Sequence, residues 1–176
     1  MKVLVTGGVR SGKSTHAESL YAGRGDVVYV APGPTVADDP DPDWAARLAA
    51  HRLRRPPSWT TLETRDLATA VTSATGPVLV DCLGTWLTAV LDAEHAWDDP
   101  AAAQLTRVTT HLDGLVAALT TTAHDAVLVT NEVGLGVVPA HRSGRVFRDL
   151  LGTVNQRVAT ACDEVHLVVA GRVLRL

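Results

Sequence analysis

The chain has 176 residues, of which 46% are hydrophobic and 20% are charged, a composition typical of a folded protein and unlike that of a disordered one. Sixteen Lys and Arg against nineteen Asp and Glu give a net charge of −3, so no basic excess favours nucleic acid or an anionic membrane as a partner. The two cysteines, Cys82 and Cys162, are too few for a disulfide scaffold. We therefore expect one domain over residues 1–176, in the reducing cytoplasm, with neither a signal peptide nor a membrane span.

Short apolar segments rich in β-branched residues alternate with longer segments of helical spacing. The segments that predict strands are 3–6, 27–31, 78–82, 127–130 and 165–169, with a short edge strand over 172–176. The segments that predict helices are 13–22, 44–55, 83–93, 101–122 and 142–162. Strands that are hydrophobic on both faces belong in a covered parallel sheet. The pattern therefore predicts an α/β fold, with a mostly parallel sheet covered by helices on both faces.

Two segments interrupt this alternation. Residues 31–43 contain four prolines and four aspartates, and Pro40 and Pro42 make this stretch poor material for a helix. Residues 58–64 are compatible with either a loop or a short strand. Long loops in compact α/β domains are often functional, so the 31–43 segment is a candidate part of the site.

The segment that follows the first predicted strand reads GGVRSGKS and fits the phosphate-binding pattern G-x-x-x-x-G-K-[ST]. In this P-loop, backbone N–H groups and a helix N-terminus surround the phosphates of ATP or GTP. The expected nucleotide-binding residues are Gly7, Gly8, Val9, Arg10, Ser11, Gly12, Lys13 and Ser14. Lys13 is expected to reach the β- and γ-phosphates, and the Ser14 hydroxyl is expected to bind Mg²⁺. The fold prediction is therefore a single P-loop NTPase-like domain.

Acidic residues follow two further predicted strands. Asp81 follows the apolar residues 78–80 in the Walker B pattern, which predicts a nucleotide-linked Mg²⁺ site shared with Ser14. The alternative role for Asp81 is a cap for the helix that follows. Glu132 follows the 127–130 segment and is a candidate for binding metal-bound water or accepting a hydroxyl proton. Its alternative is an ordinary loop glutamate.

A histidine lies among arginines on the helix predicted over residues 44–55. His51 is four residues from Arg47, so the two share a helix face, and Arg52 and Arg55 follow it. Neighbouring positive charge favours the neutral, nucleophilic imidazole and attracts a triphosphate. These residues alone leave open whether His51 attacks phosphorus or lies on a helix face with solvated arginines.

These motifs together resemble the adenosylcobinamide kinase / adenosylcobinamide-phosphate guanylyltransferase family. The similar segments are VTGGVRSGKS at 5–14, AARLAAH at 45–51 with the Arg-Pro at 55–56, VDCL at 80–83 and NEVGLGVVP at 131–139. Glu63 matches a glutamate of the family and is a candidate nucleotide contact, with a solvated loop carboxylate as its alternative. The resemblance extends from residue 3 to about residue 170.

The resemblance implies a bifunctional enzyme of cobalamin nucleotide-loop assembly. Such an enzyme phosphorylates adenosylcobinamide with ATP or GTP, then transfers GMP from GTP to adenosylcobinamide phosphate and releases pyrophosphate. It also implies that His51 carries GMP covalently and that the protein is a homotrimer. In this scheme Lys13 and Glu132 are the other catalytic residues, with Glu132 orienting the cobinamide hydroxyl.

Two other function classes are compatible with the residues alone. One is a P-loop small-molecule kinase in which His51 is inert, and the other is a P-loop NTPase switch. A guanine-reading switch is expected to carry Asn-Lys-x-Asp, which the sequence lacks. Because His51 and the P-loop lie on different elements, the bifunctional scheme predicts that the 31–43 segment or a neighbouring subunit brings the imidazole to the α-phosphate.

Overall fold

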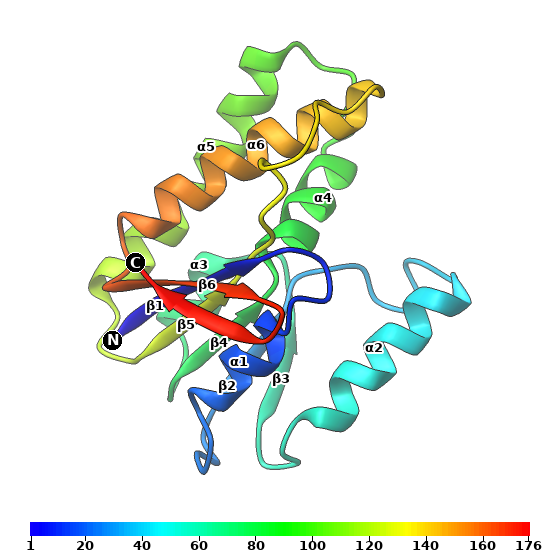
Figure 1. Ribbon diagram of the computed structural model, residues 1–176. Helices are drawn as coiled ribbons and strands as arrows, with labels where there is room; N and C mark the ends of the chain where they lie inside the picture. The colour runs from blue at the N-terminus through cyan, green and yellow to red at the C-terminus, as the bar shows by residue number, and fades with distance from the viewer.

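A seven-stranded sheet runs through the computed structural model, which describes residues 1–176 (Figure 1). The strands are β1 (Lys2–Gly7), β2 (Val28–Ala31), β3 (Thr60–Glu63), β4 (Val78–Asp81), β5 (Ala126–Val129), β6 (Glu164–Val169) and β7 (Arg172–Arg175). Their order in the sheet is β3-β2-β4-β5-β1-β6-β7. All neighbours are parallel except β6 and β7, which form an antiparallel hairpin at one edge. The predicted α/β class and mostly parallel sheet are confirmed.

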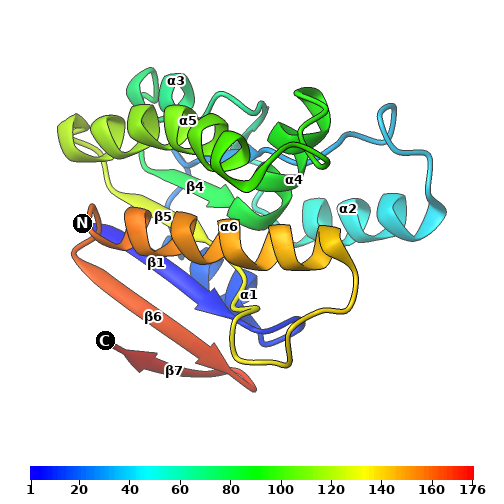
Figure 2. The ribbon, with the colours of Figure 1, turned by 90° about the horizontal axis from the view of Figure 1, so that it is seen from above.

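Helices cover both faces of the sheet, as the two-sided hydrophobicity of the strands predicts (Figure 2). They are α1 (Lys13–Ser19), α2 (Pro42–Arg54), α3 (Leu67–Thr72), α4 (Leu83–Ala93), α5 (Ala101–Thr121) and α6 (Arg142–Ala159). Successive strand residues point to opposite faces, so Leu4 packs with α3 to α6 whereas its neighbour Val5 packs with α1. The chain contains no helix long and apolar enough to span a membrane.

Helix α2 begins two residues earlier than the sequence predicts. Asp41 caps it by accepting a hydrogen bond from the backbone N–H of Asp43 at 2.9 Å, and Pro42 occupies the first turn. Proline is tolerated there because the first N–H groups of a helix have no intrahelical acceptor. The expectation that Pro42 lies outside the helix was therefore wrong, although the segment before Asp41 is irregular as predicted.

Residues 58–72 contain one strand and one helix, and the sequence prediction was incomplete here. The short-strand alternative is correct, because β3 pairs in parallel with β2 at the sheet edge. Helix α3 was missed. It is only six residues long, starts at an Asp66 cap that accepts from the N–H of Thr69, and buries Leu67 against the large core. So short an element carries too little periodicity to be recognised from sequence.

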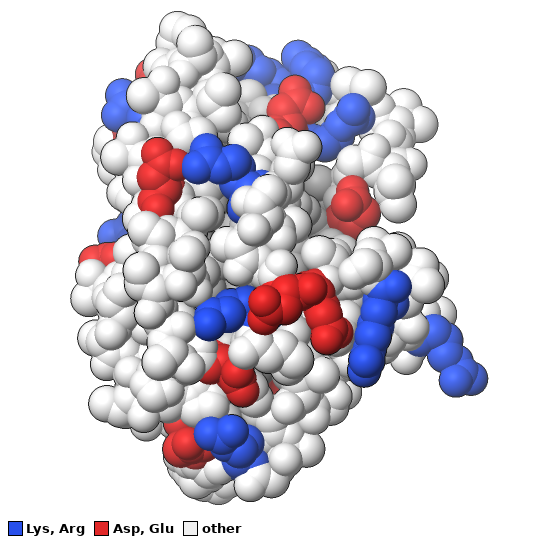
Figure 3. All heavy atoms as spheres, turned by 90° about the vertical axis from the view of Figure 1, so that its left-hand side faces the viewer, with Lys and Arg blue, Asp and Glu red and all other residues white.

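The carboxyl ends of β1, β4 and β5 bring the main motifs to one edge of the sheet. Asp81 is level with Val129 on β5, and Val129 is level with Val5, two residues before the P-loop begins. Ligands bind at this edge in open α/β sheets. On the face that is on the left-hand side of Figure 1, acidic and basic side chains are interspersed, with no broad basic region (Figure 3).

Candidate active site

The P-loop joins β1 to α1 and turns sharply because two residues adopt left-handed backbone angles. Gly12 has φ +95° and Arg10 has φ +56°. The loop closes on itself through a hydrogen bond from the N–H of Ser11 to the carbonyl of Gly8 (3.3 Å) and another from Lys13 Nζ to the same carbonyl (3.2 Å). The β6–β7 turn supports it from outside, since the N–H of Gly171 donates to the Ser11 carbonyl at 2.8 Å. The loop therefore has the curvature that aims N–H groups at an anion.

The first two glycines of the loop have different reasons to be glycine. A Cβ on Gly7 would collide with the carbonyl oxygen of Val168 and come within 2.6 Å of Ser11 Oγ, whereas a Cβ on Gly8 would meet nothing. We expect Gly7→Ala to lower the free energy of unfolding by about 1–3 kcal/mol, because the clash is with backbone. The matched control Gly8→Ala should change it little. Urea denaturation of both variants tests this, and equal stabilities would contradict the steric role of Gly7.

Lys13 is largely buried in the loop, and this burial lowers the pKa of its ammonium group below the ordinary value. A charge held with little solvation interacts strongly with an incoming anion. The position and burial of Lys13 are those expected of a lysine that binds the β- and γ-phosphates.

His16, on the helix that follows the P-loop, begins a row of three neighbouring titratable groups, of which the other two lie on β6. His16 Nε2 lies 2.9 Å from Nδ1 of the buried His166, whose Nε2 lies 2.8 Å from the Glu164 carboxylate. Burial, His166 and then Arg175 lower the pKa of His16 below its ordinary 6.5. The folded state therefore binds this proton less readily than the unfolded chain does.

We accordingly expect the protein to lose stability as the pH falls below about 6.5, where the unfolded chain takes up the His16 proton first. Above about pH 6.5 neither state binds this proton, so His16 causes no loss of stability there. Urea midpoints measured at about pH 5.5 and about pH 7.5 should differ less in His16→Gln than in the unaltered protein. The exposed His141, replaced by glutamine, serves as the control and should leave the difference unchanged. An undiminished difference in His16→Gln would contradict this account.

Asp81 lies at the end of β4 and is held in its charged form. Burial alone would raise the pKa of its carboxyl group, but hydrogen bonding with His51, Ser14 and Tyr29 outweighs burial and lowers the pKa. The Tyr29 hydroxyl donates to Asp81 Oδ2 at 3.0 Å. The carboxylate thus lies beside the Ser14 hydroxyl at the start of α1, and both are oxygen ligands of the type that Mg²⁺ prefers. These two residues fit a Mg²⁺ ion.

His51 lies beside the P-loop of its own chain. Its Nδ1 is 3.5 Å from Asp81 Oδ2 and 3.3 Å from Arg54 Nη2. The surroundings of the imidazole are therefore mixed in charge, and not uniformly positive as the neighbouring arginines predict. His51 lines a cavity of about 710 Å³ together with P-loop residues 10–14. No second subunit is needed to bring the imidazole to the P-loop.

The arginines of α2, together with Arg55 directly after it, separate into two groups. Arg47 and Arg54 line the P-loop cavity. Arg52 instead forms an ion pair with Glu63 on β3. Arg55 places its guanidinium 3.7 Å from the ring centre of Tyr29 and donates to Thr61 Oγ1. Of the three arginines around His51 that were expected to bind nucleotide, only Arg47 lines the P-loop cavity. Arg55 and Glu63 line a smaller adjoining cavity of about 60 Å³, which His51 also borders.

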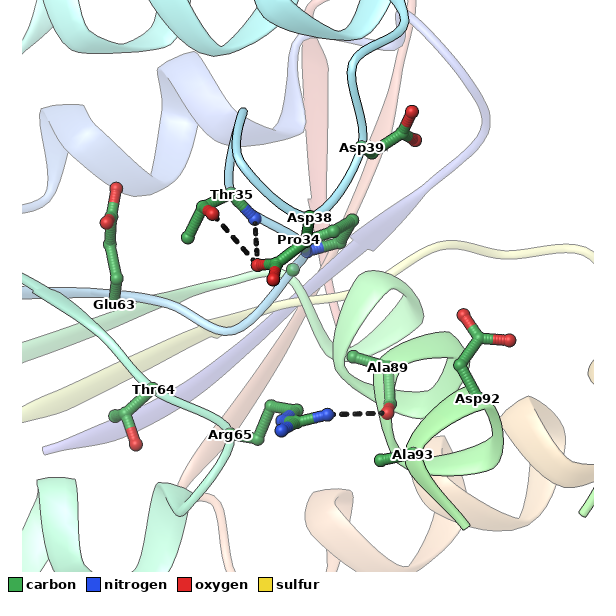
Figure 4. A pocket seen from close by; sticks show the side chains of 11 residues that line it. Pro34, Thr35, Asp38, Asp39, Glu63, Thr64, Arg65, Ala89, Asp92 and Ala93 are labelled. Carbon is green, nitrogen blue, oxygen red and sulfur yellow. Dashed lines mark hydrogen bonds between the residues drawn. The ribbon is translucent and has the colours of Figure 1, made fainter. Parts of the chain in front are cut away.

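A further cavity of about 670 Å³ lies beyond Glu63 and is lined mainly by acidic and polar groups (Figure 4). The carboxylates of Asp39, Glu63 and Asp92 reach it from three different segments. Its one basic residue, Arg65, donates to the carbonyl of Ala89. Negative charge repels phosphate, so the P-loop cavity, which Lys13 and several arginines line, suits a triphosphate better than this one does.

Glu132 is near the P-loop strand but does not line the P-loop cavity. Its N–H donates to the carbonyl of Gly7 at 3.1 Å, and its Oε1 accepts from the N–H of Gly134 at 2.7 Å. The preceding Asn131 is held by Asn155 of α6, whose amide donates to the Asn131 carbonyl. The structure thus anchors this loop beside β1, with the Glu132 carboxylate bonded within its own turn.

Sequence reasoning missed two residues of the site, Tyr29 and Glu18. Tyr29 points from β2 toward Asp81, and Glu18 points from α1 toward Arg54 of α2. Tyr29 belongs to an apolar strand and Glu18 to an amphipathic helix, so both have an ordinary structural explanation. The one available signal was the four-residue spacing of Ser14 and Glu18, which places them on one helix face.

Comparison with known proteins gives relatives over the full chain. Residues 3–176 match the family described as cobinamide kinase / cobinamide phosphate guanyltransferase. The chain is 42% identical to the bifunctional adenosylcobalamin biosynthesis protein CobU of Salmonella typhimurium, with 97% of each chain covered. It is 40% identical to the corresponding protein CobP of Pseudomonas aeruginosa, with 97% of this chain and 94% of that one covered.

Solved structures support the fold alone. An ATPase of a bacterial type III secretion system superposes with a TM-score of 0.58, at 13% identity, over 94% of this chain and 51% of the other. This likeness agrees with the P-loop and the sheet that carries it. With the match over residues 3–176 and the identities above, the chain belongs to the cobinamide kinase / cobinamide phosphate guanyltransferase family.

Proposed function

We propose that this protein carries out both reactions of its family: phosphorylation of adenosylcobinamide by ATP or GTP, and transfer of GMP from GTP to adenosylcobinamide phosphate. The observation that carries the proposal is the shared cavity, which His51 and the P-loop line together. A kinase that used only the P-loop would not require a histidine there. The family description names the same two activities.

In the kinase reaction, the P-loop N–H groups and Lys13 hold the phosphates, and Arg47 adds positive charge from α2. The cobinamide hydroxyl attacks the γ-phosphorus, and the bond to the β-phosphate oxygen breaks. Ser14 and Asp81 would hold Mg²⁺, which supplies charge neutralisation along the phosphates when bound. Glu132 accepts the hydroxyl proton, after its carboxylate leaves the Gly134 N–H that it binds in this structure.

In the guanylyl transfer, Nε2 of His51 attacks the α-phosphorus of GTP and pyrophosphate leaves. Asp81 and Arg54 both face Nδ1, and Asp81 is the only acceptor of the two, so it holds the proton on that nitrogen and leaves the lone pair on Nε2. A phosphate oxygen of adenosylcobinamide phosphate then attacks the phosphoramidate. The P–N bond breaks and the imidazole returns to its neutral form. Arg55 and Glu63 line the smaller cavity beside His51 and contact the nucleotide from the β3 side, and Arg52 holds Glu63 there through their ion pair.

We further propose that the protein is a homotrimer. Support comes from the loop between β5 and α6, where Leu135 and Val137 are almost fully exposed in the single chain, at 87% and 95%. Neighbouring large apolar side chains left in water favour association. Light scattering during gel filtration measures the mass, and a particle of one 18.6 kDa chain would contradict a trimer.

GTP labelled at the α- or the γ-phosphate tests the proposed function. With Mg²⁺ and α-labelled GTP, the protein should acquire a label that is released by acid and survives base, as a phosphoramidate does. With γ-labelled nucleotide and adenosylcobinamide, the label should move to the corrinoid. A protein that phosphorylates the corrinoid but never retains α-label would be a kinase alone.

A further inference from the structure

Helix α2 carries the nucleophile but has no buried residue. Ion pairs and a cation–π contact at its C-terminal end join it to the sheet and to α1 around His51. Arg52 pairs with Glu63 of β3, and Arg55, the residue directly after the helix, lies over Tyr29 of β2. On the side that faces the P-loop helix, the ion pair is between Arg54 and Glu18.

The pair between Glu18 and Arg54 has the geometry of a fork. Arg54 Nε donates to Oε2 of Glu18 at 3.3 Å, and Arg54 Nη2 donates to Oε1 at 3.2 Å. The Glu18 side chain is only 13% exposed. A two-point contact that is partly shielded from water fixes orientation better than an exposed single-point pair does.

Arg54 also touches the nucleophile. Its Nη2, which binds Glu18, lies 3.3 Å from His51 Nδ1, one helical turn earlier, and confines the ring by direct contact, because a guanidinium has no acceptor for the Nδ1 proton. Oxygen atoms of Glu18 and Asp81 and a nitrogen of His51 lie within 4.8 Å of one another. Such a set resembles a metal site, but the fork already occupies both Glu18 oxygens.

We infer that Glu18 is a positioning residue for guanylyl transfer: its carboxylate holds Arg54 and thereby fixes the His51 imidazole against the P-loop. The inference rests on the proposed covalent role of His51. Glu18 lies on the helix that begins at the P-loop, so the pair ties the nucleophile directly to the element that holds the phosphates. The γ-phosphoryl transfer does not use the imidazole and depends less on this contact.

The test uses Glu18→Gln, which keeps the length of the side chain and removes its charge. Two rates are measured on the same preparation: formation of protein-bound GMP from α-labelled GTP, and phosphorylation of adenosylcobinamide. The ratio of the first rate to the second should fall about tenfold or more. Glu94→Gln, which breaks a comparable pair with Arg107, is the control and should leave the ratio unchanged.

Arg54→Gln and the double variant, which carries both substitutions, complete a double-mutant cycle. Arg54→Gln should lower the ratio as Glu18→Gln does, and the double variant should be no worse than the worse single one, because one contact is lost only once. Since Arg54 lies on a helix without buried residues, its variant also tests the inference if Glu18→Gln is unstable. Equal losses in both rates, or effects that multiply in the double variant, would overturn it. Absence of label on the unaltered protein would instead refute the proposed function.

Discussion

Replacement of His51 by alanine is expected to abolish covalent attachment of GMP to the protein. The imidazole is the proposed nucleophile; it lines the P-loop cavity, and its Nδ1 lies beside Asp81. We expect the rate of labelling from α-labelled GTP to fall by about a thousandfold or more, because the variant lacks the imidazole nitrogen to which phosphorus is proposed to bond. Mass spectrometry of the intact chain measures the adduct directly.

The His51 result is interpretable only with matched variants. His51→Asn keeps most of the side-chain volume without a nucleophilic ring nitrogen, so it should lose the adduct as alanine does. His111→Ala removes a histidine that pairs with Glu94 on the surface, and it should retain the adduct. Labelled protein that persists in His51→Ala would assign the nucleophile to another residue.

Replacement of Lys13 by alanine has the second large expected effect. The ammonium group is nearly buried within the P-loop and donates to the Gly8 carbonyl across the loop, so its charge is held in the loop before a nucleotide binds. Loss of this preorganised charge should reduce kinase turnover by about a hundredfold to a thousandfold. Transfer of labelled γ-phosphate to adenosylcobinamide measures the loss.

The chain offers an unusually clean control, because Lys2 is its only other lysine. The ammonium group of Lys2 donates to the Thr122 carbonyl, away from the P-loop. Lys2→Ala should therefore leave turnover close to that of the unaltered protein, apart from any change in stability. Retained turnover in Lys13→Ala would contradict the phosphate-binding role of this residue.

The sequence by itself determined the fold class and the phosphate-binding loop. Apolar β-branched strands separated by helical segments permit little other than a covered parallel sheet. The P-loop is equally local, since eight consecutive residues contain its glycines, its lysine and its serine. Such features survive in the sequence because their cause lies in backbone geometry between near neighbours.

Only the tertiary structure decided how the remaining site residues are paired. It brings His51 to Asp81 across 30 positions, directs Arg52 to Glu63 rather than to the P-loop, and introduces Tyr29 and Glu18. These contacts join side chains on different elements, and their partners depend on strand order and on the position of α2. The sequence pattern of α2 shows which residues are charged, but no residue of this helix is buried, and its sequence does not say which polar partners it meets.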